Sequence, residues 1–162
     1  MFRPMRRFKQ QLSNEECEEI LNNCSSGVLA VIGDNGYPYA VPLSYVYLNK
    51  KIYFHCAKEG HKVDAINNND KVSFCVVAKD EVVPEELTTY FKSVIIFGKA
   101  KKLDGEELKN AAVQLGLKYY NNKDAVNKEV EKAFARMACY EITIEHITGK
   151  QAIDLMKRSL LS

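Results

Sequence analysis

The chain has 162 residues, of which 46% are hydrophobic and 27% charged, and its formal net charge is +2. This length is usual for one domain, so we predict a single domain over residues 1–162. No apolar run approaches 18 residues, which excludes a membrane-spanning helix, and the small net charge creates no global field that would attract nucleic acid. The first residues, MFRPMRRFKQQ, lack the apolar core and cleavage site of a secretory signal, so we expect a cytoplasmic protein with no membrane partner.

The cysteines are odd in number and widely spaced, without a CxxC pair: Cys17, Cys24, Cys56, Cys75 and Cys139. This distribution argues against a disulfide framework and against a structural zinc site. We expect the thiols to be reduced and mostly buried, because free cysteine usually packs as a small hydrophobic residue.

The first predicted elements are a helix and a β-hairpin. Ser13 and Glu16 form the S-x-x-E pattern of a capping box, and the apolar residues after them recur at helical spacing, which predicts a helix over residues 14–23. The apolar run over residues 27–33 is followed by Asp-Asn-Gly, and Asn-Gly favours the positive φ angles of a tight hairpin. We therefore predict a strand over 27–33 with a second strand directly after the turn.

That second strand alternates in character over residues 37–47, with one bulky aromatic face and one face of small residues. Pro42 lies in its middle and removes a ladder hydrogen-bond donor, so this strand must be bulged, at a sheet edge, or bent where a ligand or partner approaches. The chain then returns as a third strand over residues 52–57.

The remaining pattern predicts more strands than helices. Proline and several acids predict a surface loop over 79–90, and Gly98 marks a bend or a close contact. We predict further strands over 72–78, 93–100 and 137–147 and helices over 105–120 and 124–135. Six strands in a mostly meandering order indicate an α+β domain, mainly β: a small antiparallel barrel or strongly curled sheet with attached helices. Parallel doubly wound folds fit poorly, because the turns between the first three strands are too short for crossovers.

The junction around residues 53–66, YFHCAKEGHKVDAI, has the composition of an anion site. Gly60 permits a sharp turn into a helix that begins with His61 and Lys62. Free amides at a helix N-terminus attract anions, and a lysine in the first turn is otherwise unfavourable against the helix dipole. A phosphate would satisfy both features; alternatively, Lys62 points into solvent and His61 fills the N-cap region.

Two other interpretations of the junction are weaker. His55 and Cys56 are adjacent on a strand, so their side chains point to opposite faces and cannot readily bind one metal ion, and His146 lies on a distant strand. The same alternation separates a Cys56 nucleophile from a His55 base. We therefore predict no metal site.

Five segments taken in order carry a family resemblance: GVLAVIGDNGYPYAVPLSYVY, IYFHCAKEGHKVDAI, VSFCVV, YFKSVIIFGKA and ITGKQA. With these motifs the chain resembles the FMN-binding split-barrel proteins related to pyridoxamine-phosphate oxidase, and within that group the nitroimidazole-resistance (Nim) branch. The resemblance spans roughly residues 5–152. It implies a six-stranded antiparallel split β-barrel that forms a homodimer, with FMN in two clefts at the subunit interface.

The resemblance also implies which residues contact the cofactor. Residues 41–45 would lie along the flavin, residues 55–57 near the ribityl phosphate, and His61 with Lys62 on the phosphate itself. Ser93 and Val94 would lie near the ring, and Lys150 would close the cleft. The implied cofactor-binding set is Val41, Pro42, Leu43, Ser44, Tyr45, His55, Cys56, Ala57, His61, Lys62, Ser93, Val94 and Lys150.

The chain departs from the family pattern at two places. Lys92 stands before Ser93 where many relatives carry arginine, which removes a bidentate contact. The basic substrate-binding residues near the C-terminus of pyridoxamine-phosphate oxidases have no clear match, so we do not expect oxidation of vitamin B6.

Three functions agree with the sequence motifs and the family resemblance. The first is a cytoplasmic FMN-dependent oxidoreductase that acts on small electron-poor acceptors such as nitroaromatics, in which the flavin performs the electron chemistry. Its catalytic residues are unknown; His55 and His61 are the candidate acid or base groups, and the alternative for both is contact with the phosphate only. The alternatives are a flavin- or haem-binding storage protein without turnover, and a structural domain with an empty cleft.

Overall fold

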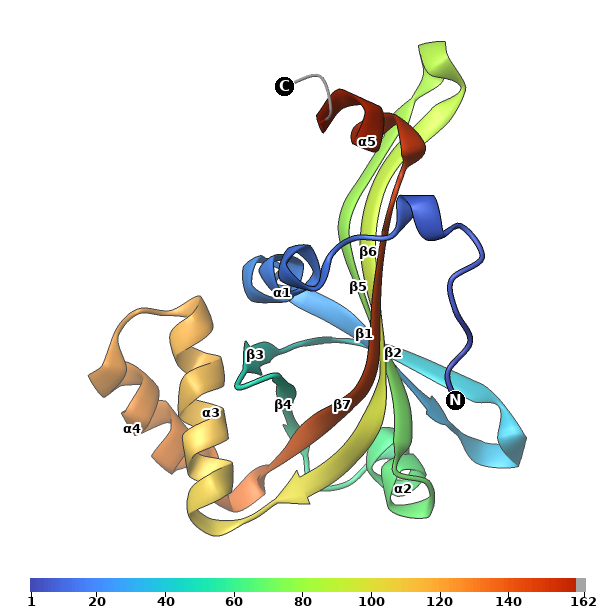
Figure 1. The fold of residues 1–162 in the computed structure, drawn as a ribbon. Helices are drawn as coiled ribbons and strands as arrows, with labels where there is room; N and C mark the ends of the chain where they lie inside the picture. Colours follow the sequence, from blue (N-terminus) through green and yellow to red (C-terminus); the bar gives the residue numbers. More distant parts are fainter. Residues whose placement is uncertain (160–162) are drawn as a thin grey trace.

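The structure, a computed structural model, describes residues 1–159, in which all the strands belong to one antiparallel sheet. The strand order is β2-β1-β5-β6-β7-β4-β3 (Figure 1). The strands are β1 (Ser26–Ile32), β2 (Pro38–Ser44), β3 (Val46–Leu48), β4 (Lys51–Ala57), β5 (Lys71–Val83), β6 (Thr88–Leu103) and β7 (Met137–Gln151). The α-helices are α1 (Asn14–Asn23), α2 (His61–Asn68), α3 (Gly105–Tyr119), α4 (Lys123–Ala133) and α5 (Ile153–Ser159). Short 3-10 turns lie at Phe8–Gln10 (η1), Asp34–Gly36 (η2), Pro84–Glu86 (η3) and Phe134–Arg136 (η4).

The sheet has seven strands, so the predicted count of six is wrong. The strand predicted over 37–47 is divided at Tyr45 into β2 and β3. These two strands lie at opposite ends of the strand order, and within residues 1–159 they do not pair with each other, so hydrogen bonds do not close the sheet. The chain therefore passes from one end of the sheet to the other across a single residue. β2 is an edge strand, which confirms one of the alternatives predicted from Pro42.

The predicted surface loop over residues 79–90 is also wrong. β5 and β6 remain paired up to Val83 and Thr88, and the turn between them is only η3 and Leu87, whose φ is 50°. The proline and acids occupy the exposed tip of a long hairpin, which projects from the sheet beside α5 (Figure 1). Local composition indicated exposure correctly, but the backbone of an exposed hairpin still pairs its strands.

Several local predictions are confirmed. Asn35 and Gly36 both have positive φ in the turn between β1 and β2. The capping box of α1 is formed: Ser13 Oγ accepts from the Glu16 N–H at 3.2 Å, and Glu16 Oε2 accepts from the Ser13 N–H at 2.8 Å. At Gly98 the β6–β7 register shifts, and an added Cβ would collide with the Thr143 carbonyl.

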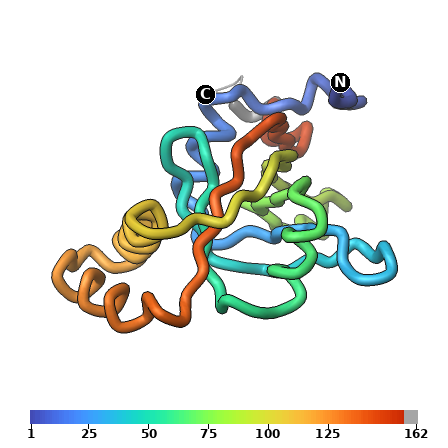
Figure 2. The backbone as a smooth tube through the Cα atoms, turned by 90° about the horizontal axis from the view of Figure 1, so that it is seen from below, coloured from blue at the N-terminus to red at the C-terminus, as the bar shows by residue number. Residues whose placement is uncertain are grey.

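Helices α3 and α4 form a hairpin inserted between β6 and β7. They lie on one side of the sheet, and the β1–β2 turn lies on the other (Figures 1 and 2). None of the helices in the described part of the chain combines the length and apolarity needed to cross a bilayer.

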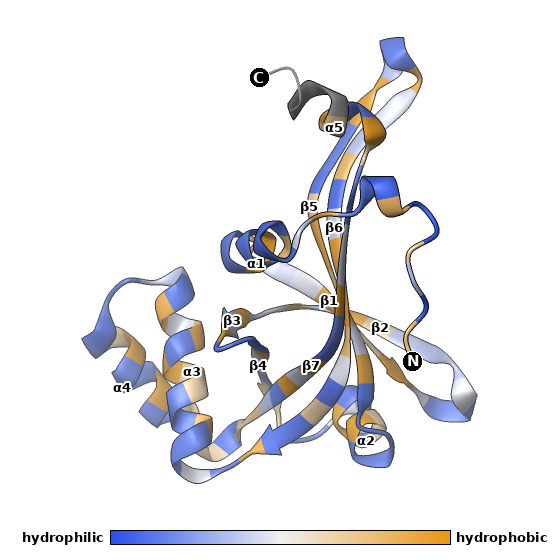
Figure 3. Cartoon of the chain, in the orientation of Figure 1, coloured by the Kyte–Doolittle hydropathy of each residue, from blue (hydrophilic) through white to orange (hydrophobic). Residues whose placement is uncertain are grey.

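Apolar side chains gather in two clusters, one on each face of β4 and β7. On β4, Ile52 and Phe54 point into the main cluster, which also contains Leu29, Phe74 and Ile96. The opposite face of these strands belongs to a second cluster under α3 and α4: Leu103, Leu108, Ala111, Ala112, Val126, Val130, Met137 and Cys139. The alternation of hydrophobic and hydrophilic residues along β5 and β6 is visible in Figure 3. Strands β4 and β7 are therefore covered on both faces, and the α3–α4 hairpin supplies the outer cover.

Candidate functional site

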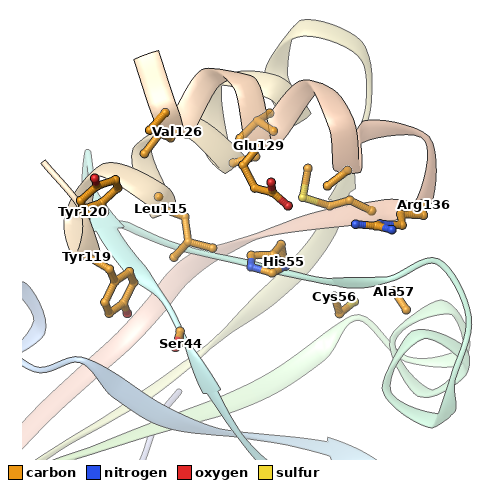
Figure 4. A pocket seen from close by; sticks show the side chains of 16 residues that line it. Ser44, His55, Cys56, Ala57, Leu115, Tyr119, Tyr120, Val126, Glu129 and Arg136 are labelled. Atoms are coloured by element: carbon orange, nitrogen blue, oxygen red, sulfur yellow. The ribbon is translucent and has the colours of Figure 1, made fainter. Parts of the chain in front are cut away.

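A cavity of about 780 Å³ lies between the end of β4 and the α3–α4 hairpin (Figure 4). Its volume lies in the range of small-molecule sites. The helices contribute apolar groups such as Leu115 and Val126, and Met137 at the start of β7 adds another. The polar groups are few and include His55, Glu129 and Arg136. Apolar walls with a few polar side chains are typical of cofactor and substrate sites.

Four residues of the predicted cofactor set line this cavity: Ser44, His55, Cys56 and Ala57. Ser44 ends β2, and the other three end β4. The two strand ends come together because β3, which follows Ser44 after one residue, pairs with β4. The division of the predicted strand at Tyr45 thus brings these residues to one site.

His55 is directed from β4 toward α4, on the side of Glu129 (Figure 4). Its direction follows from strand alternation, since Phe54 points into the main cluster. Desolvation beneath the helices lowers the pKa of His55 from its ordinary value. The imidazole is therefore neutral at pH 7 and offers one nitrogen as donor and the other as acceptor.

His61 and Lys62 begin α2 directly after Gly60, whose φ is 130°, as the sequence predicts. Neither lines the cavity. The His61 ring stacks on Tyr39 with 4.2 Å between ring centroids, and its Nε2 accepts a hydrogen bond from the Asp34 N–H at 3.3 Å. The His61 side chain thus contacts the β1–β2 turn, whereas Lys62 is half-buried. Their predicted contact with phosphate stays a prediction.

Three further residues of the predicted set lie on β6 and β7, outside the cavity lining. Ser93 pairs directly with Lys150 across the two strands, and the Lys150 Nζ lies 5.1 Å from the centroid of the Phe91 ring. Val94 is fully buried in the main cluster. Of these three residues, only Ser93 and Lys150 therefore present side chains to a ligand or a partner.

The predicted residues of β2 divide between two faces. Val41 and Leu43 are half-buried against the main cluster, and Pro42 is exposed on the opposite face. Tyr45 is fully buried, and its hydroxyl donates to the Leu21 carbonyl at 2.8 Å. The Tyr45 side chain thus belongs to the core, and only its backbone faces the break between β2 and β3.

Tyr119 of α3 fills that break. Its hydroxyl accepts a hydrogen bond from the Tyr45 N–H at 3.1 Å and lies 2.8 Å from the Tyr45 carbonyl oxygen and 2.5 Å from that of Ser25. The neighbouring Lys118 ammonium donates to the Cys24 carbonyl at 2.7 Å and lies 3.9 Å from the centroid of the Tyr45 ring. The end of α3 is thereby fixed to the strand break, and Tyr119 becomes part of the cavity wall.

Leu115 and Tyr119 lie within the helix predicted over residues 105–120, but sequence reasoning missed their place in the site, as it missed Val126, Glu129 and Arg136. Helical periodicity shows that a face is apolar without showing which surface it covers. Tyr119 contacts a backbone 74 residues away in sequence, and no local signal indicates such a contact.

Among residues 1–159, no group of three or more His, Cys, Asp or Glu side chains is arranged to bind a metal ion. All five cysteines are free. Burial raises the pKa of Cys17 to about 11 and that of Cys139 to about 12, so both thiols stay protonated at neutral pH.

The protein has a single antiparallel sheet, and a helical hairpin covers a cavity at the end of β4. Comparisons with known proteins identify the family that has this fold. Residues 13–151 match the family described as pyridoxamine 5'-phosphate oxidase. The chain therefore belongs to this family, which confirms the resemblance in the sequence motifs. No curated protein sequence matches the chain significantly.

Solved structures with the same fold include three that cover most of the chain. A conserved hypothetical protein from Mycobacterium tuberculosis has a TM-score of 0.81 at 19% identity, covering 94% of this chain and 93% of its own. A candidate 5-nitroimidazole antibiotic resistance protein from Bacteroides thetaiotaomicron has a TM-score of 0.72 at 19% identity, covering 87% and 86%. An FAD-binding protein from Mesorhizobium loti has a TM-score of 0.61 at 26% identity, covering 88% and 96%.

Proposed function

We propose that the protein binds FMN in the cavity between β4 and the α3–α4 hairpin and acts as a cytoplasmic oxidoreductase on small electron-poor acceptors such as nitroaromatic compounds. The observation that carries the proposal is the convergence of Ser44, His55, Cys56 and Ala57 on one cavity. Membership of the pyridoxamine 5'-phosphate oxidase family supports it, as does the similarity to the FAD-binding protein.

The residues of the cavity fit a flavin. Leu115, Val126 and Met137 offer apolar surface to a flat aromatic ring, while the end of β4 offers polar groups to the ribityl chain and phosphate. When bound, FMN supplies the electron transfer that amino-acid side chains do not provide. The protein's own part is to hold the ring, exclude water, and place the neutral His55 imidazole where it can give or take a proton.

The proposal includes a homodimer. On the outer face of β5 and β6, Val77, Ile95 and Phe97 are 58%, 41% and 42% exposed. Ser93 lies on the same face of β6, because Val94 and Ile96 point inward. Adjacent exposed apolar side chains are typical of a protein interface. In a dimer through this face, Ser93 and Lys150 of one subunit would approach the cavity of the other, which would unite the two separated groups of predicted residues.

Flavin binding is tested by titrating the purified protein with FMN and following the quenching of flavin fluorescence. We expect saturation at one FMN per chain, and a Lys62→Ala variant should bind FMN more weakly without a change in melting temperature. Lys71→Ala, an exposed residue just after the same helix, is the matched control and should bind normally. Protein that remains colourless and does not quench FMN contradicts the proposal.

The oxidoreductase activity is tested with the FMN-loaded protein. Chemically reduced flavin should be reoxidised faster by a nitroaromatic compound than free reduced FMN is. Bound flavin without accelerated reoxidation would instead favour the storage alternative, and a Soret band after addition of hemin would indicate haem as the ligand.

The homodimer is tested by sedimentation at micromolar concentration. Wild-type protein should sediment at twice the chain mass of 18.4 kDa, and an Ile95→Glu variant should sediment as a monomer. Wild-type protein that is monomeric with FMN bound would contradict the shared site.

A further inference from the structure

Strand pairing places the backbone of Arg136 at the end of the cavity. Arg136 is the last residue of η4 and directly precedes β7. Met137, the first residue of β7, pairs with Ala57, the last residue of β4. Figure 4 shows the Arg136 guanidinium on the cavity side, above the Cys56–Ala57 end of β4. The register of two sheet strands thus holds an arginine beside the junction where β4 gives way to α2.

Arg136 is the only cationic side chain that lines the cavity within the described part of the chain. The acid of the same cavity, Glu129, lies 3.8 Å from the ammonium of Lys132 on its own helix. Among residues 1–159 no carboxylate lies within ion-pair distance of Arg136. An arginine without an acidic partner keeps its planar fork of donors free for a bidentate contact with an anion.

Other cations strengthen the positive potential at this end of β4. Burial raises the pKa of the Cys56 thiol, and the charges of Lys62 and Lys102 oppose this rise. Neither lysine forms an ion pair within residues 1–159. His61, in contrast, is held away by its stacking on Tyr39. The cationic side chain that lines the cavity is therefore Arg136, which sequence reasoning did not name.

We propose that Arg136 is the anion-recognising residue of the cavity and makes it select ligands that carry a phosphate at the end next to Ala57. The inference rests on the proposed function, because it takes the flavin's phosphate as that anion. It predicts that the guanidinium discriminates FMN from riboflavin, which has the same ring and ribityl chain without the phosphate. The apolar part of the cavity should hold both ligands equally well.

The experiment compares the dissociation constants of FMN and riboflavin in wild type, Arg136→Gln and Arg136→Lys, measured by fluorescence quenching. Loss of a charge-assisted, bidentate contact should weaken FMN binding by about 10- to 100-fold in Arg136→Gln. Riboflavin binding should change by less than about twofold, so the preference for FMN should fall by the same factor. Arg136→Lys should recover part of the preference, because it keeps the charge without the fork.

Lys128→Gln is the matched control, since it removes one exposed cation from α4 without touching the cavity. It should retain the wild-type preference for FMN, and unchanged melting temperatures would show that all variants fold. An Arg136→Gln protein that binds FMN and riboflavin with the wild-type ratio overturns the role of Arg136 but leaves the flavin proposal intact. A wild-type protein that binds neither ligand overturns both.

Discussion

The two apolar clusters share strands β4 and β7, yet they are packed to different degrees. In the main cluster, Leu29, Phe74 and Ile96 are fully buried, whereas most members of the second cluster, such as Leu108 and Val130, keep a few per cent of their surface exposed. The second cluster also borders the cavity. Complete packing stabilises the fold, and incomplete packing under the α3–α4 hairpin provides the space for a ligand.

The largest effect should come from the main cluster. Phe74 is fully buried, and its ring lies edge-on to the Tyr45 ring with 5.1 Å between the ring centroids. We expect Phe74→Ala to lower the free energy of unfolding by about 3–5 kcal/mol, because it removes a large apolar side chain from a site that cannot collapse. Urea denaturation followed by circular dichroism measures this loss. Lys71→Ala, on the same strand, should stay within about 0.5 kcal/mol of wild type.

A smaller loss should follow from the same kind of change at the cavity wall, beside the second cluster. Leu115 is buried but lines the cavity, so its side chain already lacks neighbours on one side. We expect Leu115→Ala to lower the free energy of unfolding by about 2 kcal/mol, at the low end for such substitutions. Gln114→Ala, exposed on the same helix, is its control. A loss as large as that of Phe74→Ala would contradict the difference in packing.

The contact that joins the two regions can be removed by itself. Tyr119→Phe deletes the hydroxyl at the break between β2 and β3 and leaves the Tyr45 N–H without its acceptor. We expect a loss of about 1 kcal/mol and faster hydrogen exchange at the Tyr45 amide. Tyr120→Phe changes the neighbouring tyrosine, which is 59% exposed, and should have no such effect. Unchanged exchange at Tyr45 would show that the break does not depend on α3.

The smallest effect should be a dependence of stability on pH that arises from His55. Because burial lowers its folded-state pKa, the unfolded chain binds this proton at a higher pH than the folded chain does. The free energy of unfolding should therefore be unaffected by His55 above its ordinary pKa of about 6.5 and should decline as the pH falls below it. Unfolding measured at pH 7.5 and 5.5 should show a steeper decline in wild type than in His55→Gln. Equal slopes would contradict the desolvation of the His55 side chain at the cavity.

Most strands and most helices could be predicted from the sequence because local signals determine them. Strand alternation, the capping box at Ser13 and the Asn35-Gly36 turn each depend on residues only a few positions apart. The split at Tyr45 could not be predicted, since the alternation continues through it and only the tertiary contact with Tyr119 marks the break. The paired tip of β5 and β6 was missed because composition reports exposure rather than hydrogen bonding.

The candidate site was predictable in part for the same reason. Ser44 and the end of β4 could be named from motifs, whereas Glu129 and Arg136 reach the cavity only through the packing of α4 and the register of β7. His61 illustrates the opposite case: its position at the start of α2 was correct, but a neighbouring tyrosine determines the direction of its side chain. The motifs predicted where the backbone of each residue lies. The surroundings of the side chains could be seen only in the structure.

The α3–α4 hairpin leaves the sheet after Leu103 and returns before Cys139, and these two residues are paired neighbours on β6 and β7. An excursion that departs and arrives at adjacent points can be lengthened, shortened or exchanged while the strands beneath it keep their alignment. The helices that cover the cavity can therefore diverge in evolution independently of the strands that form its base. Homologues with the same sheet would then accommodate ligands of different size.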